Sequence, residues 1–142
     1  GKRREKIKKV IICGGGRVGY YLAAQLSTLG MQVKIIEENK KRCEELSEAL
    51  PHAMIIQGEA IDKELLLEEE IRETDAFAAM TDIDEENIML SLYAGRESKA
   101  KLITKVNRIA FENVIDSMNL GSGHYRCVHY PLCACNAKHH GK

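Results

Sequence analysis

Three consecutive glycines, between an apolar segment and an apolar helical pattern in VIICGGGRVGYYLAAQL (residues 10–26), constrain the fold of this chain more than any other feature. Gly14, Gly16 and Gly19 form the spacing G-x-G-x-x-G directly after a predicted strand. In that setting the first glycine permits a tight turn, the second lets a diphosphate approach the backbone, and the third lets helix and strand pack closely. The helix N-terminus offers N–H donors to phosphate oxygens, and Arg17 lies inside the motif. We therefore predict a turn that binds a nucleotide diphosphate.

An acidic residue, Glu37, ends the next predicted strand. An acid at this place accepts hydrogen bonds from the 2′,3′-diol of a ribose. The alternative is an ordinary strand–helix turn with Glu37 as a surface charge. A carboxylate on the diol repels a 2′-phosphate and so disfavours NADP. It does not separate NAD from ATP, ADP or AMP, because all of them have the same ribose.

Short apolar segments alternate with amphipathic segments from residue 9 to about residue 120. Strands that are apolar throughout and separated by single helices indicate a parallel sheet covered on both faces, and right-handed crossovers make such a sheet doubly wound. The sequence thus predicts an α/β fold with one Rossmann-like domain at 9–120, a size that 142 residues can hold. The predicted strands are 10–13, 32–37, 53–57, 76–80 and 102–106.

Five helices are predicted from end signals and apolar stripes. Gly30 ends the first helix, and Asn39 caps the second before Pro51 ends it. Asp62 and Asp84 open the third and the fourth. The residues expected to face the core are Val18, Leu22, Leu26 and Leu29 in the first helix, Cys43, Leu46 and Leu50 in the second, Leu65 and Leu66 in the third, Ile88 and Leu92 in the fourth, and Phe111, Val114, Ile115 and Met118 in the fifth (110–119).

Polar residues follow several predicted strands, at the carboxyl ends where open α/β sheets bind ligands. Thr81 offers a hydroxyl to a ribose or phosphate, and Lys105 or Arg108 could neutralise phosphate charge, although Arg108 is equally consistent with a surface residue. Asp84 and Glu85 most simply cap a helix and complement its dipole, in preference to binding a metal.

Charge and hydropathy exclude several classes of function. Lysine plus arginine equals aspartate plus glutamate at 21 residues each, so the chain as a whole offers no field that attracts nucleic acid or an anionic membrane. The basic lead, residues 1–8, lacks interleaved aromatics and is interpreted as a linker. No apolar segment approaches the roughly 18 residues of a membrane span, and none after the lead suits a secretory signal. We expect a cytoplasmic location without membrane insertion.

No Cys/His pair, Ser/His/Asp set or general base stands out within residues 1–120. A dehydrogenase also needs a second domain to hold its substrate, for which this chain has no room. We therefore expect a domain that binds a nucleotide and is not an enzyme, with no catalytic residue. The alternative from another class is a small NAD-dependent oxidoreductase domain or fragment. A third reading is a zinc-binding redox module centred on the C-terminal tail.

The tail, residues 121–142, is a different kind of sequence, with three of the five cysteines and four of the five histidines. Cys127-x-His129, Cys133-x-Cys135 and His139-His140 supply donors, but the spacing is not the usual pair of C-x-x-C or H-x₃-H arms of a zinc site. We interpret the tail as an atypical, non-native extension outside the fold and assign no metal ligand. On this interpretation the sheet lacks its last elements.

The sequence resembles the TrkA-N/RCK (KTN) nucleotide-binding domain family of potassium transport regulators over roughly residues 8–120. The resemblance rests on VIICGGGRVGYYLAAQL, VKIIEENKKRCEEL, IIQGEAIDKELLLEEEI, TDAFAAMTDIDEENIMLSLYA and ITKVNR, in this order. It implies a cytoplasmic regulatory subunit or domain of a Trk/Ktr-type potassium uptake system, peripheral to the inner face of the cell membrane. Its partners would be a membrane-embedded transporter subunit and further copies in a homo-oligomer. Binding of a nucleotide would shift the relative orientation of these copies and gate transport.

The resemblance further implies NAD(H) as the favoured cofactor, with ATP, ADP or AMP as the alternative. After the third strand this chain has Gly58-Glu59-Ala60-Ile61-Asp62 where the family has G-D-A-T-D, so Ile61 lacks a hydroxyl. The predicted cofactor-binding residues are Gly14, Gly15, Gly16, Arg17, Val18, Gly19, Glu37, Glu38, Gly58, Glu59, Ala60, Met80, Thr81, Asp82 and Lys105.

Overall fold

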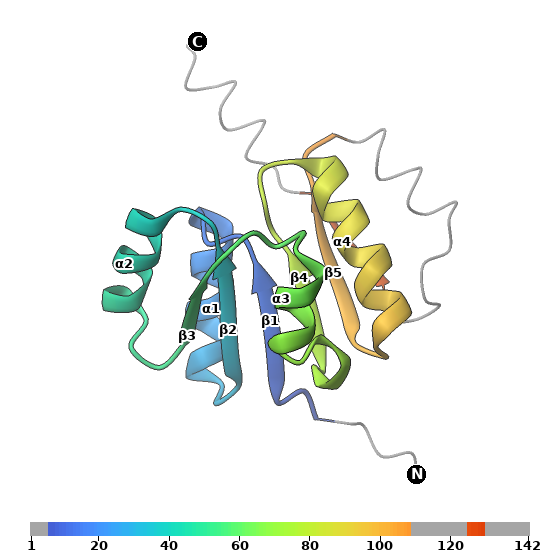
Figure 1. Cartoon of the computed structure of the whole chain (residues 1–142). Helices are drawn as coiled ribbons and strands as arrows, with labels where there is room; N and C mark the ends of the chain where they lie inside the picture. The colour runs from blue at the N-terminus through green and yellow to red at the C-terminus, as the bar shows by residue number, and fades with distance from the viewer. Residues whose placement is uncertain (1–5, 109–124, 130–142) are drawn as a thin grey trace.

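Six parallel strands form one sheet in the order β3-β2-β1-β4-β5-β6 (Figure 1). The structure, a computed structural model, describes residues 6–108 and 125–129. The chain reverses its direction of travel across the sheet after β3, so β1 and β4 are neighbours. The elements are β1 (Lys9–Cys13), α1 (Arg17–Thr28), β2 (Gln32–Glu37), α2 (Lys40–Ala49), β3 (Met54–Gln57), α3 (Lys63–Glu68), the 3₁₀ turn η1 (Ile71–Glu73), β4 (Ala76–Ala79), α4 (Asp84–Glu97), β5 (Lys101–Val106) and β6 (Tyr125–His129).

Helices cover both faces of the sheet (Figure 1). Successive residues of a strand point to opposite faces, and the apolar strands therefore place residues in a core on each face. On one face, Val10 and Ile12 of β1 pack in a cluster with residues of α1 and α2. On the other face, Ile11 of β1 and Phe77 of β4 pack with residues of α3 and α4. Phe77 is completely buried. The predicted doubly wound α/β sheet is therefore confirmed.

The predicted strands agree with the observed ones to within one residue at each end. Asn39 and Asp62 cap α2 and α3, each through a side-chain oxygen that accepts a backbone N–H bond. Gly30 follows α1 with a φ of +86°, a left-handed conformation that favours glycine. The fifth predicted helix, 110–119, lies outside the described residues.

The predicted inward faces of two helices need correction. Leu29 is 71% exposed, because α1 ends before it, and the buried residues of α1 are Gly19 and Ala23. In α4, Ile88 and Leu92 are only half-buried. The buried face of α4 is partly polar, formed by Asp84, Asn87, Leu90, Ser91 and Ala94.

The strand β6 extends the sheet beyond the last strand predicted from the sequence. It pairs in parallel with β5, with Leu102 opposite Tyr125 and Val106 opposite His129. The expectation that the sheet lacks its last elements is therefore wrong for this strand, which lies within the tail. Cys133, Cys135 and the histidines after them lie outside the described residues. Among the helices that the structure describes, none combines the length and the apolar character needed to cross a bilayer.

Candidate functional site

The glycine turn between β1 and α1 is held by backbone contacts that exclude larger side chains at two positions. Gly14 has a φ of +104°, and a Cβ there would lie 2.7 Å from the carbonyl oxygen of Met80. A Cβ on Gly19 would collide with the carbonyl oxygen of Gly14. The roles predicted for these two glycines, a tight turn and close helix–strand packing, agree with this geometry.

Gly16 differs from the other glycines of the turn, because a Cβ there would meet nothing within 4 Å. Its φ is −73°, which any residue can adopt, and it stands at the N-cap of α1 without a side-chain capping bond. The first turn of α1 contains no acidic residue and begins with the exposed Arg17. The space beside Gly16, the unpaired first amides of the helix and Arg17 together suit an anion.

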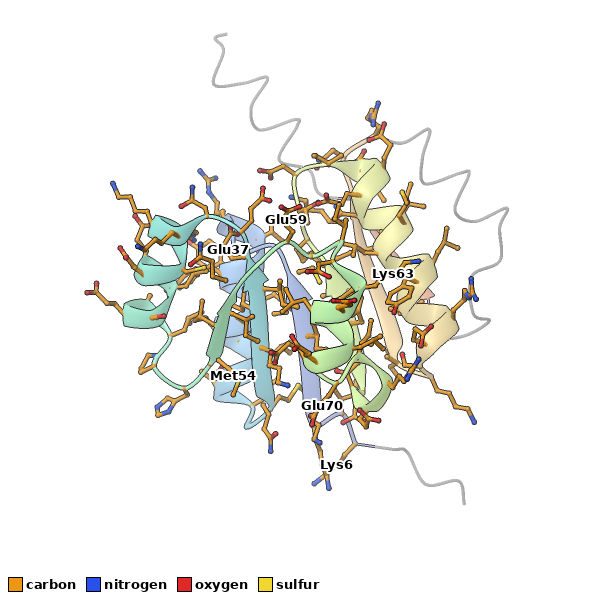
Figure 2. All side chains as sticks on the ribbon, in the orientation of Figure 1. Lys6, Glu37, Met54, Glu59, Lys63 and Glu70 are labelled. Atoms are coloured by element: carbon orange, nitrogen blue, oxygen red, sulfur yellow. The ribbon has the colours of Figure 1, made fainter. Side chains whose placement is uncertain are left out.

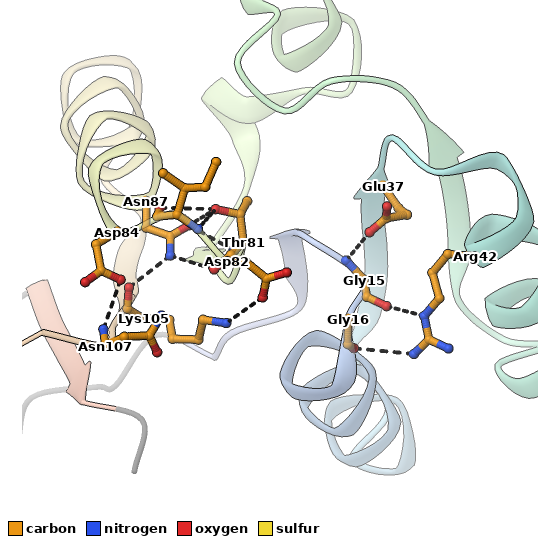
Figure 3. Close-up of polar contacts among 11 residues, drawn as sticks. Gly15, Gly16, Glu37, Arg42, Thr81, Asp82, Asp84, Asn87, Lys105 and Asn107 are labelled. Carbon is orange, nitrogen blue, oxygen red and sulfur yellow. Dashed lines mark hydrogen bonds and ion pairs between the residues drawn. The ribbon is translucent and has the colours of Figure 1, made fainter. Parts of the chain in front are cut away.

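Glu37 binds the glycine turn directly. Its Oε1 accepts a bond from the Gly15 N–H at 2.7 Å, and its Oε2 accepts one from the Asn39 N–H at 2.8 Å (Figure 3). The carboxylate thus joins the end of β2 to both the glycine turn and the N-cap of α2. Its remaining lone pairs are available to a ribose diol, since each carboxylate has about four acceptor sites.

Arg42, in the first turn of α2, also fixes the glycine turn and is not among the site residues predicted from the sequence. Its Nε donates to the carbonyl oxygen of Gly15 at 2.6 Å, and Nη2 lies 3.5 Å from that of Gly16 (Figure 3). Its Nη1 forms an ion pair with Glu45 at 3.1 Å. The one local signal is an arginine three residues after the helix cap Asn39, which does not reveal a contact with residues 15 and 16.

The opposite wall of the site is formed where β4 and β5 end, and buried Asn87 ties the two ends together. Its Oδ1 accepts bonds from the N–H and hydroxyl of Thr81 at 2.9 and 2.7 Å. Its Nδ2 donates to the carbonyl oxygens of Thr81 and Lys105 at 3.0 and 2.9 Å. One turn further along α4, Ser91 shares a buried hydrogen bond with Thr104 of β5. These bonds explain why α4 turns polar residues toward the sheet.

Asp84 has a different role from the predicted helix cap. The N-cap of α4 is Ile83, and the buried carboxylate of Asp84 accepts bonds from the N–H groups of Asn107 and Arg108 at 2.9 and 3.0 Å. The Arg108 guanidinium lies on Asp84 and Glu85, and its bond to Glu85 lowers the pKa of that carboxyl. Arg108 therefore fastens the end of β5 to α4, although the sequence also suggested a phosphate contact for it.

A cleft of about 350 Å³ lies between the two walls, over the carboxyl ends of β1, β2 and β4. This is the point where the strand order reverses, at which open α/β sheets bind their ligands. Ten predicted residues line it, namely Gly14, Gly16, Glu37, Glu38, Gly58, Glu59, Ala60, Met80, Thr81 and Asp82. Five predicted residues do not line it, namely Gly15, Arg17, Val18, Gly19 and Lys105. The lining residues that the prediction lacked are Ile36, Asn39, Arg42, Ile83 and Glu86.

The cleft is rich in carboxylates. Five acidic residues line it against one basic residue, Arg42, whose guanidinium is already bound to Glu45 and to backbone carbonyls. This excess of negative charge opposes an additional phosphate near Glu37. Cys13 lies at the end of β1, and its burial, followed by the charge of Glu86, raises the pKa of its thiol. Cys13 is fully buried, as is typical of a structural cysteine.

The sequence matches a known protein family. The model of the family described as the TrkA-N domain matches residues 10–122. A protein of Halomonas elongata called Trk system potassium uptake protein TrkA is 42% identical over 108 residues, which is 76% of this chain. The chain spans only 23% of the length of that relative.

Several solved structures have the same fold. The TrkA-N domain of the inner membrane protein ybaL from Escherichia coli has a TM-score of 0.73 at 14% identity, and covers 96% of this chain and 98% of its own. A structure described as the GsuK channel bound to NAD has a TM-score of 0.69 at 14% identity, and covers 87% of this chain and 22% of that one. At such identities the likeness establishes the fold alone.

Proposed function

The chain belongs to the TrkA-N domain family, and on that premise we propose that it is a regulatory module that binds NAD(H) and controls potassium uptake. The observation on which the proposal rests is the cleft at the reversal of strand order, where Gly16 leaves open space beside a helix N-terminus and Glu37 stands at the end of β2. A diphosphate would lie on the glycine turn, and the adenosine ribose would lie on Glu37.

NAD(H) is favoured over its phosphorylated relative by the charge of the cleft. Glu37, Glu38 and Glu59 all line the cleft, and Glu37 and Glu59 lie near each other (Figure 2). If the adenosine ribose lies on Glu37, these carboxylates would repel a 2′-phosphate. Arg42 is engaged with Glu45 and the glycine turn, which leaves it poorly placed to compensate. A fold-related channel has been described in complex with NAD. ATP, ADP and AMP share the ribose and are the alternative ligands.

The regulatory part of the proposal rests on the relatives. A protein 42% identical to this chain is named as a potassium uptake protein. We infer that this domain acts at the cytoplasmic face of the membrane, together with further copies and a membrane-embedded potassium transporter subunit. The nucleotide would gate transport by binding one arrangement of the assembly more tightly than another, since a ligand shifts an equilibrium only by its differential affinity. Potassium flux into vesicles that hold the transporter subunit and this protein, measured with and without NADH and ATP, tests this step.

Nucleotide binding is tested by calorimetric titration with NADH, NAD, NADPH, ATP, ADP and AMP, with Gly16→Ala as the matched variant. The added methyl group meets no neighbour in the fold but narrows the cleft beside the helix N-terminus. We expect Gly16→Ala to lose tenfold or more in affinity, an order-of-magnitude figure for a steric block of a phosphate contact, while its melting temperature changes by only about 2 °C. Equal affinity in both proteins would contradict a diphosphate at this turn. Hydride transfer from NADH to an added carbonyl compound would favour the oxidoreductase alternative.

A further inference from the structure

Lys105, at the end of β5, is a buried cation whose ammonium group pairs with an exposed anion. Only 4% of the residue is exposed, and its Nζ lies 3.5 Å from Oδ1 of Asp82. The Asp82 side chain is fully exposed. Figure 3 shows the Lys105 side chain extending from β5 toward the glycine turn, with the Asp82 carboxylate at its end. The pair therefore stands between the buried wall of α4 and the cleft.

The two members of this pair differ in how firmly they are held. The main chain of Lys105 is bound through its carbonyl oxygen to Asn87, and Asp84 binds the amide groups of residues 107 and 108. Thr81, the residue before Asp82, is bound to the same Asn87 by three hydrogen bonds, so the main chain beside Asp82 is also held in place. Within residues 6–108, the Asp82 carboxylate has no hydrogen bond or ion pair other than that to Lys105. Rotation of the exposed Asp82 side chain thus breaks its one contact with Lys105 and leaves the hydrogen bonds of the wall in place.

Asp82 also lines the cleft, whereas Lys105 does not. A phosphate group on the glycine turn would approach the wall on which Asp82 stands. It would meet the charge of Asp82 added to those of the other carboxylates in the cleft. The cation that could attract it, Lys105, lies directly behind that carboxylate.

We propose that Asp82 competes with the phosphates of the nucleotide for Lys105 and thereby sets the affinity of the site for phosphorylated ligands. When such a ligand binds, the Asp82 carboxylate leaves the ammonium group, which then faces the phosphate. The Asp82 carboxylate is fully exposed, so water screens its charge and solvates it when it leaves the pair. The incoming phosphate supplies an anion to the buried ammonium group in exchange. This inference rests on the proposed nucleotide function. It adds Asp82 as the residue that sets how strongly the site prefers a phosphorylated ligand over an uncharged one.

The test is a double-mutant cycle with Asp82→Asn and Lys105→Met, titrated with ADP and with adenosine. Asparagine keeps the size of Asp82 and removes its charge, and methionine fills the volume of Lys105 without a charge. Glu86→Gln removes another cleft carboxylate that is not paired with Lys105 and serves as the matched control. We expect Asp82→Asn to bind ADP roughly three- to tenfold more tightly than the wild type, with adenosine affinity unchanged and a smaller gain in Glu86→Gln.

The gain must depend on Lys105. In the Lys105→Met background, Asp82→Asn should improve ADP binding no more than Glu86→Gln does. An equal gain with and without Lys105, a gain for adenosine, or no gain over Glu86→Gln would each overturn the inference. If Lys105→Met does not fold, Lys105→Gln supplies a second background without the positive charge, in which the same comparison is made. Wild-type protein that binds none of the nucleotides would refute the proposed function itself, whereas wild-type binding without the Asp82 effect refutes only this inference.

Discussion

At the scale of single residues, Glu37 has two functions that one substitution cannot separate. Both carboxylate oxygens accept backbone N–H bonds, so the residue fixes the glycine turn and the start of α2 as well as facing the cleft. The sequence motif predicts either a ribose contact or a surface charge for Glu37. Spacing along the chain does not show that the N–H groups of Gly15 and Asn39 point at this carboxylate. A loss of nucleotide binding in a Glu37 variant would therefore not by itself prove a ribose contact.

We predict that Glu37→Ala lowers the free energy of unfolding by about 1–3 kcal/mol, because two N–H groups lose a charged acceptor, and also weakens nucleotide binding. Glu37→Gln keeps an acceptor for Gly15 and should lose less stability than Glu37→Ala. The neighbouring Glu38 is exposed, and Glu38→Ala should change stability by less than about 0.5 kcal/mol. Urea unfolding of the three variants checks the order. Equal stability of Glu37→Ala and the wild type would show that the two hydrogen bonds of Glu37 do not stabilise the fold.

At the scale of elements, β1 and β4 are tied at their amino ends by Asp75. Its Oδ2 accepts bonds from the N–H groups of Lys8 and Lys9, both at 2.9 Å. These bonds, the one from Lys8 first, lower the pKa of the Asp75 carboxyl. A lowered pKa in the folded state means that the bonds stabilise the fold above the usual aspartate pKa, and that this stabilisation is lost as the pH falls through the lowered value.

Asp75→Asn should therefore lower the free energy of unfolding by about 0.5–1 kcal/mol above pH 5, where the wild-type carboxylate is charged and half-exposed. Below about pH 4 the difference between the two proteins should shrink, because the wild-type residue also loses its charge. Melting curves of both proteins from pH 3 to pH 7 check this. A difference that stays constant down to pH 3 would show that the charge of Asp75 is not its source.

The element boundaries followed from the sequence, but the buried face of α4 did not. Asn39 and Asp62 act through bonds within a few residues, which a local pattern can predict. Asp84 has the same local pattern, yet its partners are the N–H groups of residues 107 and 108, which directly follow β5. Asn87 and Ser91 are buried for the same reason. Their partners lie at or near the ends of β4 and β5, which no local pattern shows. A prediction from hydrophobic periodicity alone therefore placed Ile88 and Leu92 in the core instead.

At the scale of the whole molecule, the cleft exists because successive strands are added to one side of β1 as far as β3 and then to its other side from β4 onward, while all strands stay parallel. One half, β1-β2-β3, supplies the glycine turn and Glu37, and the other, β4-β5-β6, supplies Thr81 and Asp82. In the first half, the fixed spacing of the glycine motif and of the acid that ends β2 predicted Gly14, Gly16 and Glu37. Four residues predicted from the same motif, Gly15, Arg17, Val18 and Gly19, do not line the cleft. Arg42 and Glu86, which complete the cleft, have no such spacing, because their contribution depends on how α2 and α4 pack.

A nucleotide that lies across this cleft should protect both halves together. We predict that saturating NADH slows amide hydrogen exchange in peptides covering residues 14–20 and in those covering residues 80–87. Where exchange requires release of the ligand, slowing on the order of 100-fold is expected at 100 times Kd. Peptides covering residues 69–76, which lead into the amino end of β4, should not change. Gly16→Ala should lose the protection of both segments at the same NADH concentration. Protection confined to residues 14–20 would instead indicate an anion held by the glycine turn alone, and the wall formed by α4 would then have no part in binding.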